Sequence, residues 1–522
     1  MKRGDLLVAL GLATLAVASV AVPLDAARRG AEARGGAWTG LDASRDLAQY
    51  ACIADAARDG GGVLLANPYA PGSDRTVLAI GLSAAGWIAR FAGVDVAAAL
   101  VLVHLAAVSL FPFALLRLLA GLGLGAATRR VAAVVVVLGG GMAFFVARLA
   151  EIDPSVLRWR TDVEPSYGWS TLAALANPLW ALALGLGLLA IDALVRAERS
   201  PAPARLVGLG VLAALLYPTH AYLGGGLLVV LGALAVVSPA RSRLLAALAP
   251  AVALAAGHVA LVFGGDAQPA GIGRVLRAHT FTPLEAIGGL GLLIPLGLAG
   301  LAILRHRPAD RGALRVLGVW LAVAVALAWN PFVIGVKFAT LIHPPLAALS
   351  GVALLRLARG GRGRAALALA TAAVVLSAAP QVVRIRAANA ASGYAPYARL
   401  EPGEAAVLAA LADAPPGPVL SVETAGVRLP WLAGRTPWLG HWFLTPEFAA
   451  RREEARGLFA PERAGGMGGM GGAAAFCRER GIAVVLWREG DEAFFGECPP
   501  ATWPRFLVAD RSSLVLVPAE TE

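Results

Sequence analysis

Charged residues are scarce in this chain of 522 residues, where Asp, Glu, Lys and Arg together make up 15% of the total. Ordinary soluble proteins contain about 25% charged residues. With 58% hydrophobic residues and a mean hydropathy of +0.69, the chain has more apolar surface than a soluble fold of this length can bury. The composition therefore excludes a large soluble enzyme and indicates a polytopic α-helical membrane protein.

Lysine is rarer still, because the basic residues are almost all arginine and lysine occurs only at Lys2 and Lys337. The glycine-rich stretch "RAGGMGGMGGAAA" (463–475) has no lysine and lacks the spacing of a phosphate-binding loop, which excludes a nucleotide site there. It is typical of a flexible connection.

Only three cysteines are present, Cys52, Cys477 and Cys498, and no His/Cys spacing typical of a zinc site occurs. Cys477 and Cys498 flank one predicted strand. Two interpretations stay open for this pair: a disulfide in an oxidising compartment, or two free thiols.

The formal net charge of +11 is spread along the chain and is not massed on one soluble domain. Basic clusters occupy alternate connections between hydrophobic runs, from "MKRGD" at the start to "RLARGGRGR" (356–364). Most acids lie in the other connections, at 25–75, 150–170 and 264–283. This pattern follows the positive-inside rule and differs from a nucleic-acid footprint. It predicts a cytoplasmic N-terminus, an extracytoplasmic C-terminus and no nucleic-acid partner.

Hydrophobic runs of about 20 residues, the length that crosses a bilayer as a helix, recur through residues 1–384. They predict about eleven spans: 6–24, 97–119, 131–149, 171–195, 204–220, 221–238, 243–263, 284–304, 312–330, 338–357 and 364–380. A further candidate helix is 76–93. The first run also resembles a cleaved signal peptide, and in either case the loop 25–75 faces outward.

The composition changes after residue 384. "LEPGEAAVLAALADAPPGPVLSVE" predicts a helix followed by a strand, "AAAFCRERGIAVVLWREG" repeats that order, and "RFLVADRSSLVLVPAE" predicts a hairpin. Residues 385–522 are therefore predicted to form a small extracytoplasmic α/β domain after the transmembrane domain 1–384.

The first outer loop contains an acidic segment, "TGLDASRDLAQYACIADAARDG" (39–60). Thr39 and Asp42 have the spacing of a capping box, which predicts a helix start there. Asp42, Asp46 and Tyr50 then share one helix face, because they are four residues apart. An amphipathic helix lying on the outer leaflet, with acids in water, is the structural alternative.

These features resemble the GT-C superfamily of integral-membrane glycosyltransferases, which includes protein O-mannosyltransferases and aminoarabinose transferases. The family's first outer loop carries an acidic motif of the form Asp-(acid)-x-x-Tyr with a glycine after it, matched here by Asp46, Tyr50 and Gly60. Leu47 stands where the second acid is expected, so Asp42 or Asp55 would have to serve if two are needed.

More narrowly, the chain resembles a bacterial GT-C-like subgroup through several longer segments: "NPYAP", "ANPLWALALGLGLLAIDAL", "LLYPTHAYLGG", "WNPFVIGVKFATLIHPPLAAL" and "GRTPWLGHWFLTPEFAARREEARGLFAP". The resemblance implies a multi-pass protein of the bacterial cell membrane. It also implies sugar transfer from a polyprenyl-phosphate donor to a glycan, lipid or protein acceptor, with inversion and with Asp46 as the base. Some relatives use a divalent metal, so a divalent metal stays open here: the outer acids Glu151, Asp153, Asp162 and Glu164 could supply a second carboxylate or help bind one, and no metal ligand is assigned.

The leaving group in such a reaction is a lipid phosphate, which calls for cations at the outer boundary. Lys337 is the first candidate, Arg274, Arg277 and His279 form a second group, and His220 in "YPTHAY" is a third. Snorkelling to lipid headgroups or interfacial anchoring would explain the same residues structurally.

Two other functions remain open. A transporter or flippase of a lipid-linked saccharide would show internal repeats and broken helices meeting at the midplane, and no repeat is evident. A non-catalytic GT-C-like scaffold is the third interpretation, because the second acid of the motif is missing.

Overall fold

The computed structural model describes most of the chain: residues 2–42, 45–60, 62–70, 75–140, 170–264, 283–330, 335–358, 397–442, 444–460 and 470–518, with a few positions between 368 and 391. These residues group into two compact units. Unit 1 comprises the described residues of Met1–Val22, Val101–Leu261 and Arg274–Arg386, and unit 2 those of Pro23–Leu100, Val262–Gly273 and Ala387–Glu522. Unit 2 thus contains both residues 25–75, here called the first outer segment after the location predicted for them, and the C-terminal residues.

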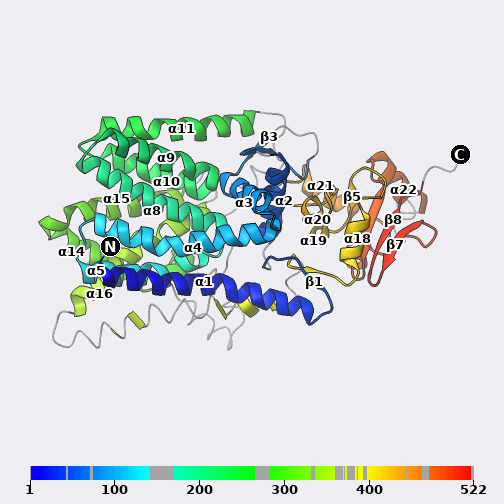
Figure 1. The fold of residues 1–522 in the computed structure, drawn as a ribbon, viewed down its shortest axis with the longest axis horizontal. Coiled ribbons are helices and arrows are strands. Elements are labelled where there is room, and N and C mark those ends of the chain that lie inside the picture. The colour runs from blue at the N-terminus through cyan, green and yellow to red at the C-terminus, as the bar shows by residue number, and fades with distance from the viewer. Residues whose placement is uncertain are drawn as a thin grey trace. The chain divides into compact units, whose positions relative to one another are not determined.

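Unit 1 is helical (Figure 1). It is built from α1 (Arg3–Glu32, first part), α4 (Val96–Gly121, all but its first turn), α5 (Ala126–Leu138), α7 (Thr171–Ala174), α8 (Pro178–Arg199), α9 (Pro203–Thr219), α10 (Ala221–Val236), α11 (Arg241–Gly264, all but its last turn), α13 (Pro283–Leu290), α14 (Leu293–Arg305), η3 (Pro308–Asp310), α15 (Arg311–Ala328), η4 (Gly335–Leu341) and α16 (His343–Ala358).

Six helices of the described residues are long and apolar enough to cross a membrane: α1, α4, α8, α11, the segment 308–328 and the segment 337–358. Shorter apolar helices include α3, α9, α10 and α14. Large apolar side chains such as Leu110, Val207 and Val252 are more than half exposed on these helices. Water disfavours such surfaces and lipid tails accommodate them, so the chain is a polytopic helical membrane protein.

Most predicted spans correspond to helices, and several differ in detail. The span 284–304 is two helices, α13 and α14, separated at Gly291, whose φ of +47° lies outside the right-handed helical region. The span 338–357 begins as the 3₁₀ helix η4 before α16. In the span 171–195, Asn177 caps α8 by accepting hydrogen bonds from the backbone N–H groups of Leu179 and Trp180. Most of 364–380 and the end of 131–149 lie outside the described residues, so the count of eleven stays a prediction.

Buried polar side chains join helices within unit 1. His343, which is fully buried, contacts Thr171 Oγ1 through Nδ1 at 2.9 Å and Gly139 O through Nε2 at 2.9 Å. His104 Nε2 contacts Leu175 O at 2.7 Å. Satisfied hydrogen bonds of this kind are what a low-dielectric interior requires of polar groups. His104, 4% exposed, thus has a packed, hydrogen-bonded role between helices.

Unit 2 contains the first outer segment and the C-terminal residues. Its elements are β1 (Ala37–Trp38), α2 (Arg45–Gly60), β2 (Leu64–Ala66), β3 (Arg75–Leu78), α3 (Ile80–Ala92), β4 (Arg399–Leu400), α18 (Glu404–Ala410), β5 (Val419–Leu420), α19 (Glu423–Gly426), α20 (Leu429–Ala433), α21 (Phe448–Ala455), α22 (Met470–Glu479), β6 (Val484–Arg488), α23 (Glu492–Phe495), β7 (Arg505–Ala509) and β8 (Ser512–Leu516).

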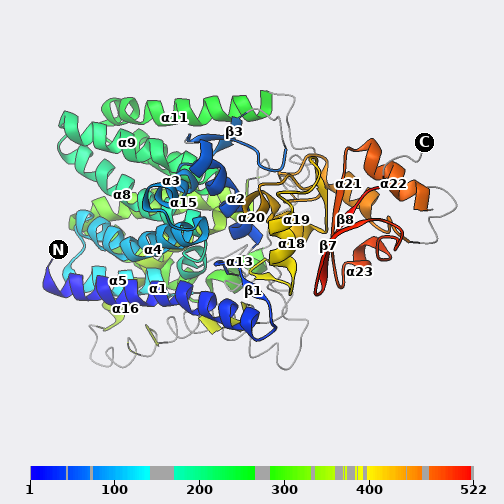
Figure 2. The ribbon, with the colours of Figure 1, turned by 45° about the vertical axis from the view of Figure 1, so that its right-hand side comes forward.

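The C-terminal part of unit 2 is built on a four-stranded sheet of order β5-β6-β8-β7, of which β7 and β8 are labelled in Figure 2. β5 and β6 are parallel, whereas β6–β8 and β8–β7 are antiparallel. Every residue of β6 is buried, as expected for a central strand covered on both faces. The predicted helix–strand pairs and the predicted hairpin are present, with β7 and β8 as the hairpin strands.

A buried ionic network joins α18, α20 and the end of β6. Arg428 and Glu404, both 0% exposed, pair at 2.7 Å between Nη2 and Oε1. Arg488 lies 3.5 Å from the same Glu404 oxygen and also pairs with Asp491. Burial is the main cause that lowers the pKa of Arg428, and Glu404 opposes it. Removing one member would leave an uncompensated charge in the interior.

Candidate functional site

The helix α2 begins later than the sequence predicts. Thr39 does not cap it: its backbone N–H and its hydroxyl both donate to Ala398 O, at 2.9 Å and 3.1 Å, where β1 pairs with β4. The helix starts at Arg45, so Asp42 precedes it. The predicted capping box is therefore wrong, because the Thr39 hydroxyl bonds to a distant backbone carbonyl instead. The predicted helix face shared by Asp42 and Asp46 is also wrong, because Asp42 lies before the helix.

Close contacts within unit 2 hold α2 in place. A Cβ at Gly86 of α3 would lie 2.3 Å from Ala54 O, so the two helices approach more closely than any side chain at that position allows. Tyr69, in the segment "NPYAP", donates its hydroxyl to Val427 O at 2.8 Å. The buried thiol of Cys52 contacts the same carbonyl at 3.2 Å, and burial raises the pKa of Cys52 to about 12. The first outer segment and the C-terminal residues thus share one packed core.

Asp46 lies in the first turn of α2 and is half-buried. Tyr50 follows one turn later on the same face, as predicted, with its side chain 8% exposed. Among the residues that the structure describes, none forms a hydrogen bond or an ion pair with the Asp46 carboxylate. Asp42 is also half-buried, outside the helix.

Asp55 of α2 carries a buried carboxylate. It is 9% exposed, and burial raises its pKa to about 6, although the Arg58 guanidinium 2.9 Å away opposes the shift. A carboxylic acid whose pKa lies close to neutral pH can both accept and release a proton there, which suits it to proton transfer. The sequence offered Asp55 as an alternative second acid but carried no signal for its burial.

In unit 1, two of the predicted residues meet around an aromatic ring. Lys337 Nζ, in η4, lies 5.5 Å from the centre of the Trp180 ring, and the His220 ring lies 5.6 Å from it in an edge-on orientation. His220 ends α9 and caps α10, where its Nδ1 accepts the N–H of Leu223 at 3.1 Å. A cation over the face of a tryptophan is held without losing its charge. Trp180 belongs to the segment "ANPLWALALGLGLLAIDAL" that carries the family resemblance, but no sequence pattern marks it as a site residue.

The other predicted cations, Arg274, Arg277 and His279, lie outside the described residues. Within the parts of the chain that the structure describes, no group of three or more His, Cys, Asp or Glu side chains is arranged to hold a metal ion.

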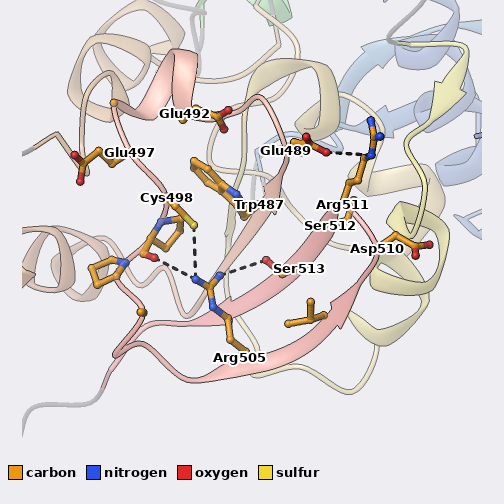
Figure 3. A pocket seen from close by; sticks show the side chains of 15 residues that line it. Trp487, Glu489, Glu492, Glu497, Cys498, Arg505, Asp510, Arg511, Ser512 and Ser513 are labelled. Atoms are coloured by element: carbon orange, nitrogen blue, oxygen red, sulfur yellow. Dashed lines mark hydrogen bonds and ion pairs between the residues drawn. The ribbon is translucent and has the colours of Figure 1, made fainter. Parts of the chain in front are cut away.

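A hollow of about 980 Å³ lies in the C-terminal part of unit 2 (Figure 3). Arg505, Arg511, Trp487 and Glu489 are among the side chains that line it. The Arg505 guanidinium donates to Ser513 Oγ at 3.3 Å and to a neighbouring backbone carbonyl, and Arg511 pairs with Glu489 at 3.0 Å. Arg505 and Arg511 therefore make structural contacts within the domain.

The cysteine pair predicted to be either a disulfide or two free thiols is free in the structure. Cys477 is buried, and burial raises its pKa to about 12, whereas Cys498 is exposed beside the hollow. A buried, protonated thiol is chemically inert.

No protein-family model matches the chain, and no curated protein matches it. Several solved structures match it. Arabinofuranosyltransferase AftD from Mycobacteria matches with a TM-score of 0.54 and 17% identity, over 94% of this chain and 37% of AftD. The chain thus spans little more than a third of AftD.

ArnT from Cupriavidus metallidurans, bound to undecaprenyl phosphate, matches with a TM-score of 0.50 and 13% identity, over 96% of this chain and 97% of ArnT. Its apo structure also gives a TM-score of 0.50 and 13% identity, over 90% and 93% of the two chains. AftD and ArnT are GT-C membrane glycosyltransferases, and the chain has their fold. The resemblance predicted from the sequence is confirmed at the level of the fold.

Proposed function

We propose that this chain, a polytopic membrane protein with the GT-C fold, transfers a sugar from a polyprenyl-phosphate donor to an acceptor on the extracytoplasmic face of the membrane. The observation that carries the proposal is the likeness to ArnT over 96% of the chain, since ArnT was solved with undecaprenyl phosphate bound. The positive-inside pattern supports an N-terminus in the cytoplasm and places the first outer segment on the opposite side.

The proposed chemistry uses Asp46 as the base. An acceptor hydroxyl attacks the anomeric carbon and forms the new C–O bond, while the bond from that carbon to the phosphate oxygen breaks. The hydroxyl proton moves to the Asp46 carboxylate, and the phosphate leaves on the polyprenyl chain, which inverts the anomeric centre. The half-burial of Asp46 and the absence of a described ion-pair partner on its carboxylate support this role. Tyr50, on the same helix face, is assigned to substrate positioning, and Asp42 or Asp55 to the second acid.

The leaving phosphate needs a cation, and Lys337 is assigned to it. The flat face of Trp180 and the ring of His220 beside the ammonium group limit its positions, which reduces the entropy lost when a phosphate binds. A fixed positive charge favours the transition state, because negative charge builds on the phosphate as the sugar departs. Arg274, Arg277 and His279 remain proposed contacts on sequence grounds.

The experiment is sugar transfer by the purified full-length protein in lipid nanodiscs, supplied with a panel of radiolabelled polyprenyl-phosphate sugars and a cell-envelope acceptor fraction. We expect labelled product from one donor of the panel. Lys337→Met should raise the KM for that donor about tenfold, corresponding to about 1.4 kcal/mol of lost binding. Arg305→Met, which removes an exposed cation from the end of α14, serves as the matched control. A folded protein that transfers no sugar from any donor would overturn the proposal.

A further inference from the structure

Two arginines of unit 1 are oriented by one buried carboxylate. Asp192 of α8, 1% exposed, accepts hydrogen bonds on Oδ2 from Arg117 Nε at the end of α4 and from Arg196 Nε one turn further along α8, each at 2.8 Å. The arginine side chains are 56% and 45% exposed. Since these contacts use only Nε, the terminal Nη groups of both arginines have no hydrogen-bond partner among the described residues. Their Nη groups can therefore donate hydrogen bonds to a ligand.

A second buried carboxylate repeats the arrangement at the start of α1. Asp5, 2% exposed, pairs with Arg130 Nε at 2.8 Å and also with the Arg129 guanidinium. Lys2 precedes it and has no ion-pair partner in the described part of the chain. Arg129 and Arg130 belong to the first turns of α5. The two clusters together hold five cations against two carboxylates, which leaves three positive charges uncompensated.

Four of these cations border an apolar groove, here called the α4–α8 groove, with a volume of about 860 Å³. Lys2, Asp5, Arg117, Arg129 and Arg196 line one part of it. The remaining wall is apolar and comes from two helices: Leu110, Phe113 and Ala114 of α4, with Leu182, Gly185 and Leu186 of α8. A phosphate and an apolar chain attached to it would therefore find complementary surfaces side by side.

We propose that the α4–α8 groove binds one anionic phospholipid, with its phosphate on Arg117, Arg196 and Lys2 and an acyl chain along the apolar wall. The surplus of positive charge favours an anionic headgroup, and arginine Nη groups bind phosphate oxygens bidentately. Basic pockets between transmembrane helices on the cytoplasmic side are suited to such headgroups. The positive-inside pattern predicts that the groove's cations lie on that side, in the leaflet opposite the one proposed for sugar transfer.

The dimensions of the groove favour a membrane phospholipid over a soluble phosphate. From Leu182 to Arg196 the lining of the groove, apolar as far as Leu189 and cationic at Arg196, extends about 21 Å along α8, at about 1.5 Å per residue. That length exceeds the hydrocarbon depth of one leaflet, about 15 Å. Leu110 in this wall is 65% exposed, so an acyl chain would cover apolar surface. A free phosphate would leave this surface uncovered.

The experiment is native mass spectrometry of the full-length protein with equimolar phosphatidylglycerol, phosphatidylethanolamine and polyprenyl phosphate. We expect one phosphatidylglycerol to be retained preferentially. Gly185→Leu should lower its occupancy at least tenfold, because a Cβ at Gly185 meets open space and the larger side chain fills the groove without displacing the fold. Gly257→Leu, on the exposed face of α11 where a Cβ also meets open space, is the matched control and should retain the lipid.

A charge variant tests the headgroup separately. Lys2→Gln, which breaks no ion pair with a described residue, should reduce phosphatidylglycerol retention severalfold without lowering the unfolding temperature. Free glycerol phosphate in excess should not displace the lipid. Equal retention by Gly185→Leu and Gly257→Leu, equal retention of phosphatidylethanolamine, displacement by glycerol phosphate, or preferential retention of polyprenyl phosphate would each overturn the assignment.

Discussion

Replacing Asp55 with asparagine should stabilise the protein at neutral pH and not at acid pH. Burial raises the pKa of Asp55 from 3.8 to about 6 in the folded state. This rise in pKa means that ionising the Asp55 carboxyl costs about 3 kcal/mol more in the folded state than in the unfolded state. The folded state therefore binds this proton more tightly than the unfolded state does. The contribution of Asp55 to stability falls as pH rises from about 4 to about 6 and stays low above that.

Asparagine has the same shape and no charge, so Asp55→Asn should remove this penalty. At pH 7.5 we expect a gain of up to about 3 kcal/mol, and at pH 4 a difference close to zero. For a cooperative unit of about 150–250 residues, each kcal/mol shifts the unfolding temperature by about 2–4 °C. The assay is thermal unfolding of the purified protein at both pH values, with a predicted rise of up to about 10 °C at pH 7.5.

Asp59→Asn is the matched control, because Asp59 lies on the same helix and pairs with the same Arg58 at 2.9 Å. Its side chain is 67% exposed, so its replacement should change the unfolding temperature by about a degree or less. The reasoning would be refuted if Asp55→Asn unfolded at a lower temperature than the native protein at pH 7.5. It would also be refuted if the two variants behaved alike.

Arg428→Met should lower stability by about 3–5 kcal/mol, because it leaves Glu404 charged and buried with only Arg488 nearby. The double variant that also carries Glu404→Gln should recover much of the loss, and no recovery in thermal unfolding would count against the pairing. Gly86→Val should cost at least about 1–3 kcal/mol, because its Cβ would lie 2.3 Å from a backbone oxygen of α2. Protease susceptibility of the outer segment measures this effect, and an unchanged cleavage rate would argue against the close approach.

The long helices could be predicted from hydropathy, because a bilayer imposes a length and an apolar composition on each span. The bounds of α4, α9, α10 and α11 match the predicted spans within a few residues. Hydropathy did not reveal the break at Gly291 or the 3₁₀ start of η4, since local backbone conformation leaves the average composition of a span unchanged.

The candidate site was harder to predict, because its residues acquire their environments from distant parts of the chain. Thr39 has the spacing of a capping residue, yet its hydroxyl bonds to Ala398, which no local rule anticipates. Asp55 is an acidic residue, which the sequence suggests is exposed, yet the fold buries it. Lys337, His220 and Trp180 meet although they come from three separate segments. The residue types indicated which side chains could take part in the chemistry. Their burial and neighbours, which depend on tertiary packing, could not be predicted from the sequence.

The most direct test of the central claim is sugar transfer by Asp46→Asn, measured in a single turnover with saturating polyprenyl-phosphate sugar. The variant keeps the shape of the side chain and loses the proton acceptor, so the account predicts at least a hundredfold slower transfer with unchanged donor binding. Transfer at the native rate by a correctly inserted Asp46→Asn protein would contradict it.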